Sequence, residues 1–240
     1  MSDREPVEVR SFAFGEPDGD LAGTASIWDG GGCSTFGLPN QVEGSDPEEE
    51  WRLSGAGFEL TFAPAGAVAE LELAEAGIRS LHQLAHVHGT VVIGGDEHVV
   101  DCAGQRSRRI GAPDGKRFDA MRTVSAWFGE ADGLAVLAAR PRKARGHDAE
   151  LLSALLVENG VAIHVEDPRL STTYSAAGVP MRLGLELWIQ DEAGEQYPRR
   201  AAGEALGQAA VSEDPPLRSE LVRMRMRGRR GVGVYERQQA

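Results

Sequence analysis

The chain has few cysteines, few aromatic residues and no long apolar run. Its two cysteines, Cys33 and Cys102, could form at most one disulfide, and no Cys-x-x-Cys pair is present. A zinc ribbon and a thioredoxin-type redox site are therefore excluded. No stretch approaches the roughly 20 apolar residues that a membrane-spanning helix needs. The opening residues, MSDREPVEVR, lack the apolar stretch of a signal peptide. We expect a cytoplasmic protein without an integral membrane segment.

The chain also lacks an excess of basic residues. Lys and Arg number 25 against 37 Asp and Glu, which gives a formal net charge of −12 at pH 7. Such a protein repels phosphate backbones, so we do not expect a nucleic-acid partner. The sequence contains no phosphate-binding loop, Gly-x-Ser-x-Gly elbow or His-Glu-x-x-His motif. We predict no bound cofactor and no metal.

What the sequence does contain is enough apolar residues for a core, together with many turn formers. Of its 240 residues 41% are hydrophobic, and there are 30 glycines and 12 prolines. This length suits one large domain or two small ones. Short segments such as 51–53, 58–62 and 181–189 alternate apolar and polar residues between Gly, Pro and Asp clusters. Period-two alternation of this kind is typical of half-buried strands.

The longest strand-like run is Leu81–Ile93, which ends at Gly94-Gly95-Asp96 and is followed at hairpin distance by residues 98–102. Residues 39–50 are polar and acidic and indicate a loop. Many short strands with turns every 8–12 residues predict an antiparallel sandwich or barrel.

Two segments fit a helix as well as a strand. Residues 68–73 and 151–156 are rich in Ala, Glu and Leu, and Asp148 could cap a helix through the second segment. The Asn159-Gly160 pair that follows is a strong hairpin signal, so it favours the strand there.

Several segments share short motifs with a known family. They are Trp51-Arg52-Leu53 and residues 57–64, 87–91, 171–174, 178–180, 183–188 and 230–236. These segments resemble the two-domain, lipocalin-like family of AttH and the carotenoid hydratases (hydroxyneurosporene synthases). The resemblance implies a mostly-β fold, with two antiparallel lipocalin-like barrels or curled sheets packed in tandem. We expect an N-terminal domain of residues 1–113 and a C-terminal domain of residues 114–240.

The sequence departs from that family in one central segment. Many relatives carry Gly-x-Arg-Asp-His-Ser-Trp-Gly, whereas residues 104–111 read GQRSRRIG. Ser107, Arg108 and Ile110 replace the acid, the histidine and the tryptophan. The resemblance therefore implies the fold and an apolar-ligand cavity more than it implies a hydration reaction.

The best candidate for chemistry is a group of histidines in the longest strand-like run. In a strand, His82, His86 and His88 would share one face with Leu84 and Thr90. His86 and His88 would lie about 7 Å apart, and imidazoles transfer protons near neutral pH. This face could equally be an ordinary polar surface or a set of groups that orient a ligand. A metal site is a further alternative, but no residue is fixed as a third ligand.

Arginine and tryptophan supply the remaining candidates. Arg106 belongs to a basic island with Arg108 and Arg109, which could anchor an anionic head group at a barrel mouth or form salt bridges with the many acidic residues. Trp127 and Trp188 lie in strand-like runs and could fill the core or form the wall of an apolar ligand cavity.

We predict that the protein binds a small apolar or amphipathic molecule, isoprenoid-like or lipid-like, in a barrel cavity. His82, Arg106, Trp127 and Trp188 would contact it. One alternative is a hydratase- or cyclase-type enzyme, in which His86 or His88 transfers a proton to an unsaturated apolar substrate. Another is a structural or interaction protein with filled barrels, which would lack a cavity of about 300 Å³.

Overall fold

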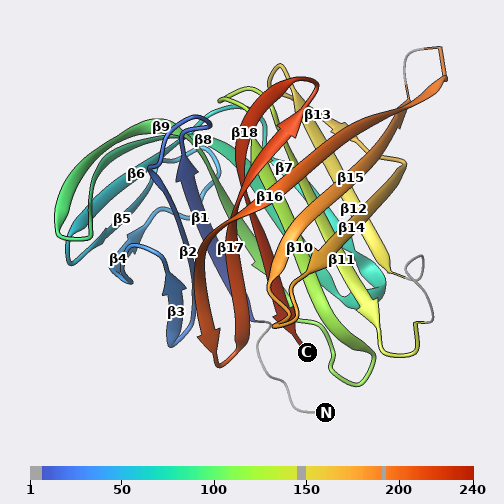
Figure 1. Cartoon of the computed structure of the whole chain (residues 1–240), viewed down its shortest axis with the longest axis horizontal. Helices are drawn as coiled ribbons and strands as arrows, with labels where there is room; N and C mark the ends of the chain where they lie inside the picture. The colour runs from blue at the N-terminus through green and yellow to red at the C-terminus, as the bar shows by residue number, and fades with distance from the viewer. Residues whose placement is uncertain (1–6, 145–149, 191–192) are drawn as a thin grey trace.

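The computed structural model describes residues 7–144, 150–190 and 193–240, so Asp148 lies outside the described residues. Antiparallel strands in two sheets make up nearly all of it (Figure 1). The first sheet contains β1 (Glu8–Gly15), β2 (Ala22–Trp28), β3 (Gly31–Ser34), β4 (Pro39–Glu43), β5 (Trp51–Gly55), β6 (Phe58–Pro64), β7 (Ala69–Leu73), β8 (Ile78–Ile93) and β9 (Asp96–Ile110). A short 3₁₀ helix, Ala74–Ala76, separates β7 from β8.

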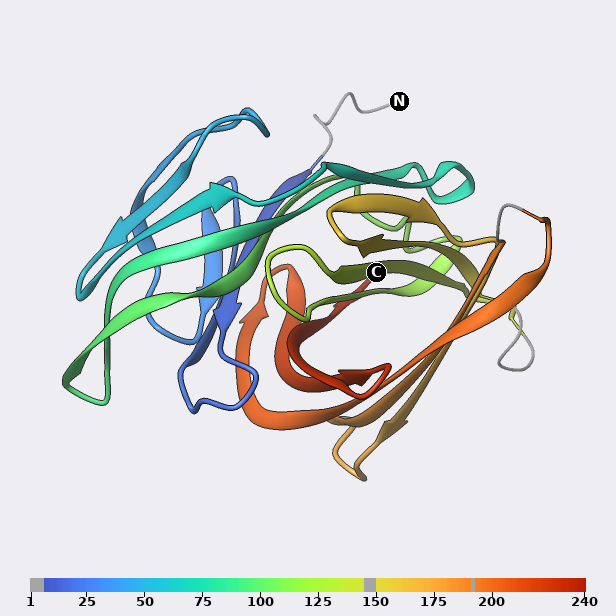
Figure 2. The same cartoon turned by 90° about the horizontal axis from the view of Figure 1, so that it is seen from above.

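The second sheet begins after Ile110. It contains β10 (Phe118–Trp127), β11 (Gly133–Pro141), β12 (Leu151–Glu158), β13 (Val161–His164), β14 (Asp167–Tyr174), β15 (Pro180–Gln190), β16 (Gln196–Glu213), β17 (Pro216–Met226) and β18 (Arg229–Gln239). Figure 2 shows the two curled sheets side by side. The mostly-β fold with two curled antiparallel sheets, expected from the sequence, is confirmed.

Each sheet is an up-and-down barrel that remains open along one line. The first and last strands of each sheet pair, β1 with β9 and β10 with β18. The strand orders are β3-β2-β1-β9-β8-β6-β5-β4, with β7 also on β8, and β13-β12-β11-β10-β18-β17-β16-β15-β14. Within the described residues, the ladder of the first sheet is therefore interrupted only between β3 and β4, and that of the second sheet only between β13 and β14. We call the second interruption the β14 seam.

The turn chemistry explains most of the hairpins. Gly94 and Gly95 have φ of 67° and 97° and connect β8 to β9. Asn159 and Gly160 have φ of 52° and 78°, as a two-residue hairpin turn requires, and connect β12 to β13. The two ambiguous segments are accordingly strands, β7 and β12. The loop expected over residues 39–50 is wrong at its start, because β4 pairs there with β5.

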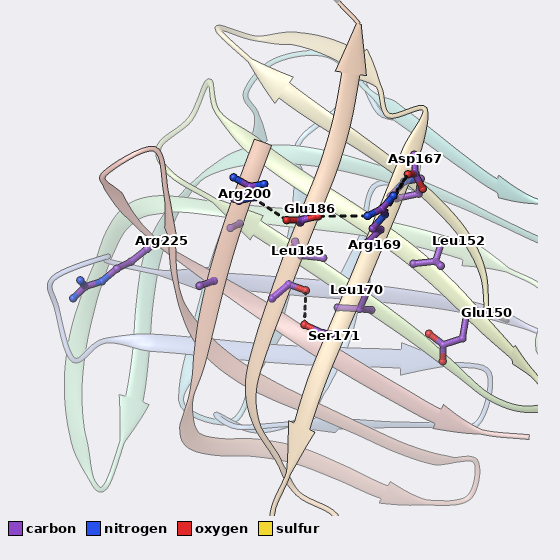
Figure 3. Close-up of a pocket in the computed structure, with 14 residues that line it drawn as sticks. Glu150, Leu152, Asp167, Arg169, Leu170, Ser171, Leu185, Glu186, Arg200 and Arg225 are labelled. Carbon is purple, nitrogen blue, oxygen red and sulfur yellow. Dashed lines mark hydrogen bonds and ion pairs between the residues drawn. The ribbon is translucent and has the colours of Figure 1, made fainter. Parts of the chain in front are cut away.

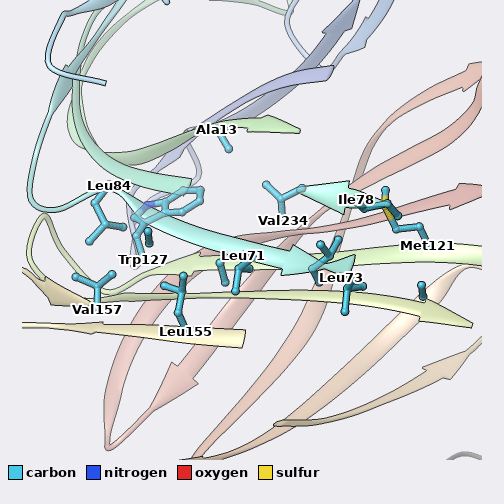
Figure 4. Packing of buried hydrophobic residues seen from close by; sticks show 14 of the residues in the cluster. Ala13, Leu71, Leu73, Ile78, Leu84, Met121, Trp127, Leu155, Val157 and Val234 are labelled. Atoms are coloured by element: carbon cyan, nitrogen blue, oxygen red, sulfur yellow. The ribbon is translucent and has the colours of Figure 1, made fainter. Parts of the chain in front are cut away.

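The three largest clusters of buried apolar side chains lie one inside each barrel and one between the barrels. The interior of the first barrel is filled by aromatic rings, namely Phe12, Phe14, Phe36, Trp51, Phe58 and Phe62. The cluster between the barrels combines Leu71, Leu73 and Leu84 of the first sheet with Trp127 and Leu155 of the second (Figure 4). Burial of each large side chain contributes roughly 2 kcal/mol, so this shared cluster fixes how the sheets pack.

Candidate ligand-binding site

Two sizeable cavities lie in the second half of the chain. One has a volume of about 1110 Å³ and lies along β14, β15 and β16, and another of about 620 Å³ lies beside the β14 seam. A groove of about 410 Å³ lies over β7, β8 and β9. The spaces beside His82 and Arg106 in the first half have only about 10 Å³ each, which is room for one water molecule at most.

The 620 Å³ cavity, which we call the seam cavity, has a strongly basic lining. Its walls come from β10, β11, β14 and β18 and from the residues next to β12 and β14. The lining residues are Ala120, Arg122, Arg140, Glu150, Leu170, Ser171, Thr172, Tyr174, Gly178 and Arg237. Three arginines thus face one glutamate, in a chain whose net charge is −12.

Strand register brings these arginines together. Arg122 on β10 is the cross-strand partner of Arg237 on β18, which in turn is the partner of Arg218 on β17. Direct partners in an antiparallel pair project to the same face, so the three side chains form a row. Arg218 pairs with Glu220 at 2.6 Å, and Arg122 pairs with Glu150.

Two arginines of the seam cavity have no carboxylate partner. The guanidinium of Arg237 lies 5.6 Å from the centre of the Tyr174 ring, in the geometry of a cation–π contact. Neither Arg237 nor Arg140 forms an ion pair with any carboxylate in the part of the chain that the structure describes.

Two tyrosines complete the polar side of this cavity. The hydroxyl oxygens of Tyr174 and Tyr235 lie 2.5 Å apart, and Tyr235 also accepts a hydrogen bond from Arg122. Burial raises the pKa of Tyr235, so its phenol is neutral at physiological pH. Burial also opposes the charge on Arg122, but Tyr235 and Glu150 outweigh it and raise the pKa of Arg122.

The larger cavity has a balanced charge. Figure 3 shows Asp167, Arg169, Glu186 and Arg200 in a row across β14, β15 and β16. Asp167 and Arg169 are 2.8 Å apart, Arg169 and Glu186 are 3.8 Å apart, and Glu186 and Arg200 are 2.8 Å apart. Leucines supply apolar surface beside this row, and Glu150, Leu170 and Ser171 line both cavities, which therefore adjoin.

The histidines predicted for catalysis lie on one face of β8, as expected, but that face is directed toward the second sheet. His86 is 37% exposed, and its Nδ1 lies 2.8 Å from Glu130 while its Nε2 lies 3.2 Å from Asp101. His88 is exposed, and its ring centre lies 5.8 Å from that of His86. Neither residue lines one of the large cavities.

His82 is enclosed in a polar layer between the sheets. Its Nδ1 lies 3.1 Å from the amide nitrogen of Gln105, and its Nε2 lies 2.8 Å from the hydroxyl of Ser80. An amide nitrogen can only donate, so Nδ1 accepts and Nε2 carries the proton. Burial lowers the pKa of His82 to about 4, so the ring is neutral.

The same layer contains a carboxylate that binds three hydroxyl groups. Oε1 of Glu236 accepts hydrogen bonds from Ser26 at 2.7 Å and from Ser11 and Ser219 at 3.0 Å. Ser11 and Ser26 belong to the first sheet, so this carboxylate links the two halves. Arg109 adds a second link through a bond of 2.7 Å to Gln238.

Arg106 is buried against the Trp51 ring, with 1% of its surface exposed and 4.6 Å between guanidinium and ring centre. Its five N–H groups all donate within the protein. The acceptors are Oε1 of Gln83 at 2.7 and 3.0 Å and the main-chain oxygens of Pro47, Glu49 and Phe62 at 2.5, 2.5 and 3.1 Å. A guanidinium has no sixth donor for a ligand. Burial lowers the pKa of Arg106 to about 10, so it stays charged at neutral pH.

The two predicted tryptophans lie outside the large cavities. Trp127 is fully buried in the cluster between the sheets, and its indole N–H donates to the main-chain oxygen of Gly15 at 3.2 Å (Figure 4). Trp188 is half-buried on the outer face of β15, 6.0 Å from the guanidinium of Arg169. The roles that we predicted for the histidines, Arg106 and the tryptophans remain predictions.

The sequence analysis missed the residues that line the seam cavity. Arg122 and Arg237 are far apart in the chain and become neighbours only through the pairing of β10 with β18. A sequence signal was present, because an arginine on the inner face of an apolar strand is unusual. Within the described residues, no group of three His, Cys, Asp or Glu side chains could hold a metal ion, and no helix is long and apolar enough to cross a membrane.

Comparisons with known proteins find similarity of structure only. No family model matches the chain, and no curated protein matches it. The crystal structure of CghA with Sch210972 is similar, with a TM-score of 0.62 and 13% identity over 98% of this chain and 88% of that one. Kievitone hydratase from Nectria haematococca has a TM-score of 0.61 and 11% identity, over 98% of this chain and 89% of that one.

A third structure belongs to the family suggested by the sequence motifs. It is the proposed AttH protein NE1406 from Nitrosomonas europaea, with a TM-score of 0.63 and 12% identity over 99% of this chain and 93% of that one. Identities this low establish the fold alone. The chain therefore has the AttH-like, lipocalin-like fold that its sequence resembles.

Proposed function

We propose that this protein binds a small amphipathic molecule in the seam cavity and the larger cavity beside it. The observation that carries the proposal is the contrast between the two barrels. Aromatic rings fill the first, whereas the second contains adjoining cavities of about 620 and 1110 Å³. Sites for small molecules commonly measure about 300–1,000 Å³ and combine apolar walls with a few polar groups.

The lining supports an amphipathic occupant. Leu152, Leu170 and Leu185 provide apolar surface from three strands (Figure 3). Arg122, Thr172 and Tyr174 provide hydrogen-bonding groups at the seam. The alternative of filled barrels predicts no cavity as large as the two in the second half. It therefore fits the first half only.

A hydratase- or cyclase-type activity is the second candidate. Kievitone hydratase is among the structures with this fold. The enzyme hypothesis drawn from the sequence assigns proton transfer to His86 or His88, which lie outside the large cavities. The hydroxyl of Tyr174 does line the seam cavity and could donate a proton or a hydrogen bond to a bound substrate.

Two measurements test binding. Native mass spectrometry of the purified full chain should detect a co-purified small molecule, and the neutral fluorophore N-phenyl-1-naphthylamine should bind with one site per chain. Ala120 lines the seam cavity and is buried, whereas its neighbour Asp119 is exposed on the other face of β10. Ala120→Trp should fill the cavity and weaken fluorophore binding by about tenfold or more, and Asp119→Trp should not.

Both variants need the same near-ultraviolet circular dichroism as the wild type. If folded Ala120→Trp binds the fluorophore as tightly as the wild type does, the binding site lies elsewhere. The absence of both a co-purified molecule and fluorophore binding would contradict the proposed function.

A further inference from the structure

We infer that the molecule in the seam cavity carries a carboxylate, which Arg122, Arg237 and Arg140 bind. This inference rests on the proposed function and adds the chemical class of the ligand. Its basis is the arrangement of charge around the cavity, which differs from that of the larger cavity and of the groove over β7, β8 and β9.

The first step is the charge balance of the two adjoining cavities. Three basic and three acidic side chains line the larger one, and most of them pair with one another across β14, β15 and β16. Three arginines and the single carboxylate of Glu150 line the seam cavity. Although the chain as a whole is acidic, this surplus of positive charge makes the seam cavity attractive to an anion.

The second step concerns the hydrogen-bond donors that remain available. Arg122 donates to Glu150, to Tyr235 and, at 3.0 Å, to Thr172, so it contributes mainly its positive charge to the cavity. Arg237 contacts only the Tyr174 ring, and Arg140 has no ion pair there. A planar fork of N–H groups matches the two oxygens of a carboxylate, which favours a planar acid.

The third step is the tyrosine pair, which supplies a neutral donor beside the arginines. Arg122 can only donate, so Tyr235 accepts from it, and either hydroxyl can be the donor in the bond between Tyr174 and Tyr235. In the arrangement in which Tyr235 donates, the hydroxyl proton of Tyr174 is available to an acceptor in the cavity. The apolar part of an acid would extend from this point toward Leu170, which lines both cavities.

The experiment compares two ligands of equal chain length, decanoate and 1-decanol, by displacement of N-phenyl-1-naphthylamine at pH 7.5. Decanoate should bind about tenfold or more tightly than 1-decanol, because charge-assisted hydrogen bonds are stronger than neutral ones. Added salt should weaken decanoate binding and leave 1-decanol binding nearly unchanged.

Substitution of single arginines shows where the carboxylate of decanoate binds. Arg237→Gln and Arg140→Gln remove a charge from the seam cavity without removing a carboxylate's partner. Each should reduce decanoate affinity by about tenfold and leave 1-decanol affinity unchanged. Arg223→Gln is the matched control, since Arg223 is exposed on β17 and lines neither cavity, and it should bind both ligands as the wild type does.

The outcomes separate the two proposals. Equal affinity of the wild type for decanoate and 1-decanol would overturn the acid specificity and leave the proposed function standing. Failure of the fluorophore and both ligands to bind would overturn the proposed function itself. If both seam variants weaken the two ligands equally, the arginines maintain the structure of the cavity, and the inference is wrong.

Discussion

The hydroxyl groups of Tyr174 and Tyr235 form a hydrogen bond of 2.5 Å between strands that are not neighbours in the sheet. Tyr174 is the last residue of the edge strand β14, and Tyr235 lies in β18, with three strands of the ladder between them. The bond therefore crosses the interior of the second barrel. It fixes the edge strand at the position where the seam cavity opens.

A double-mutant cycle measures this bond. Tyr174→Phe and Tyr235→Phe should each lower the free energy of unfolding, and the double variant should lose about 1 kcal/mol less than the sum of the two. Urea denaturation of the four proteins gives the four values. Additive losses would show that the two hydroxyls do not stabilise each other.

Replacement of Arg106 should destabilise the first barrel strongly. Arg106→Lys keeps the charge but provides three donors in place of the five hydrogen bonds that Arg106 makes to four acceptor atoms, and it leaves the Trp51 ring without its planar partner. We expect a loss of about 3 kcal/mol in the free energy of unfolding. Arg52→Lys on β5 of the same sheet is the control, since that side chain is 59% exposed. Equal stability of the two variants in denaturation would contradict a structural role for Arg106.

His82 should make the protein less stable in mild acid. Its pKa falls from 6.5 to about 4 on folding, so the unfolded chain binds the extra proton first. The contribution of His82 is complete above pH 6.5 and decreases as the pH falls toward 4, by about 3 kcal/mol in all. Denaturation at pH 7, 6, 5 and 4 should show this slope in the wild type and a smaller one in His82→Gln. If the free energy of unfolding falls equally with pH in both proteins, His82 does not cause the loss of stability in acid.

Alanine at both His86 and His88 tests the catalytic role predicted from the sequence. The contacts of His86 with Asp101 and Glu130 are at the surface, so the double variant should lose under about 1 kcal/mol of stability. Binding of N-phenyl-1-naphthylamine should be unchanged, because neither ring lines a large cavity. In a turnover assay with an unsaturated apolar substrate, activity that survives in this variant would exclude His86 and His88 as proton donors. Loss of that activity would support their predicted role in proton transfer.

Much of the fold follows from local patterns. The alternation of residues 58–62 and 81–93, together with the glycines at 94, 95 and 160, predicts strands and hairpins that the structure confirms. The longest strand, β16, is the main omission, because Gln196–Glu213 is rich in Ala and Gly and has no regular apolar alternation. Its strand state depends on pairing with β15 and β17 rather than on its own composition.

The candidate site is harder to predict from the sequence. Alternation correctly places His82, His86 and His88 on one face of a strand. Which environment that face meets depends on the second sheet, which buries His82 and leaves His88 exposed. The seam cavity requires the register of β10 with β18 and the position of β14, and both are set by residues at least 50 positions apart. The spacing of residues along the chain therefore does not predict this register or the position of β14.

The incomplete ladder of the second barrel determines how it can accommodate a guest. Within the described residues, the backbone of β14 is bonded as a strand to β15 alone. β15 in turn pairs with β16, so an outward movement of β14 has to bend the sheet at its ladder with β15 or at the ladder between β15 and β16. No backbone ladder on the β13 side has to break, unlike in the widening of a fully closed barrel. The width of the guest therefore depends on the side-chain contacts of β14, such as the bond between Tyr174 and Tyr235, and on how far this edge of the sheet can bend.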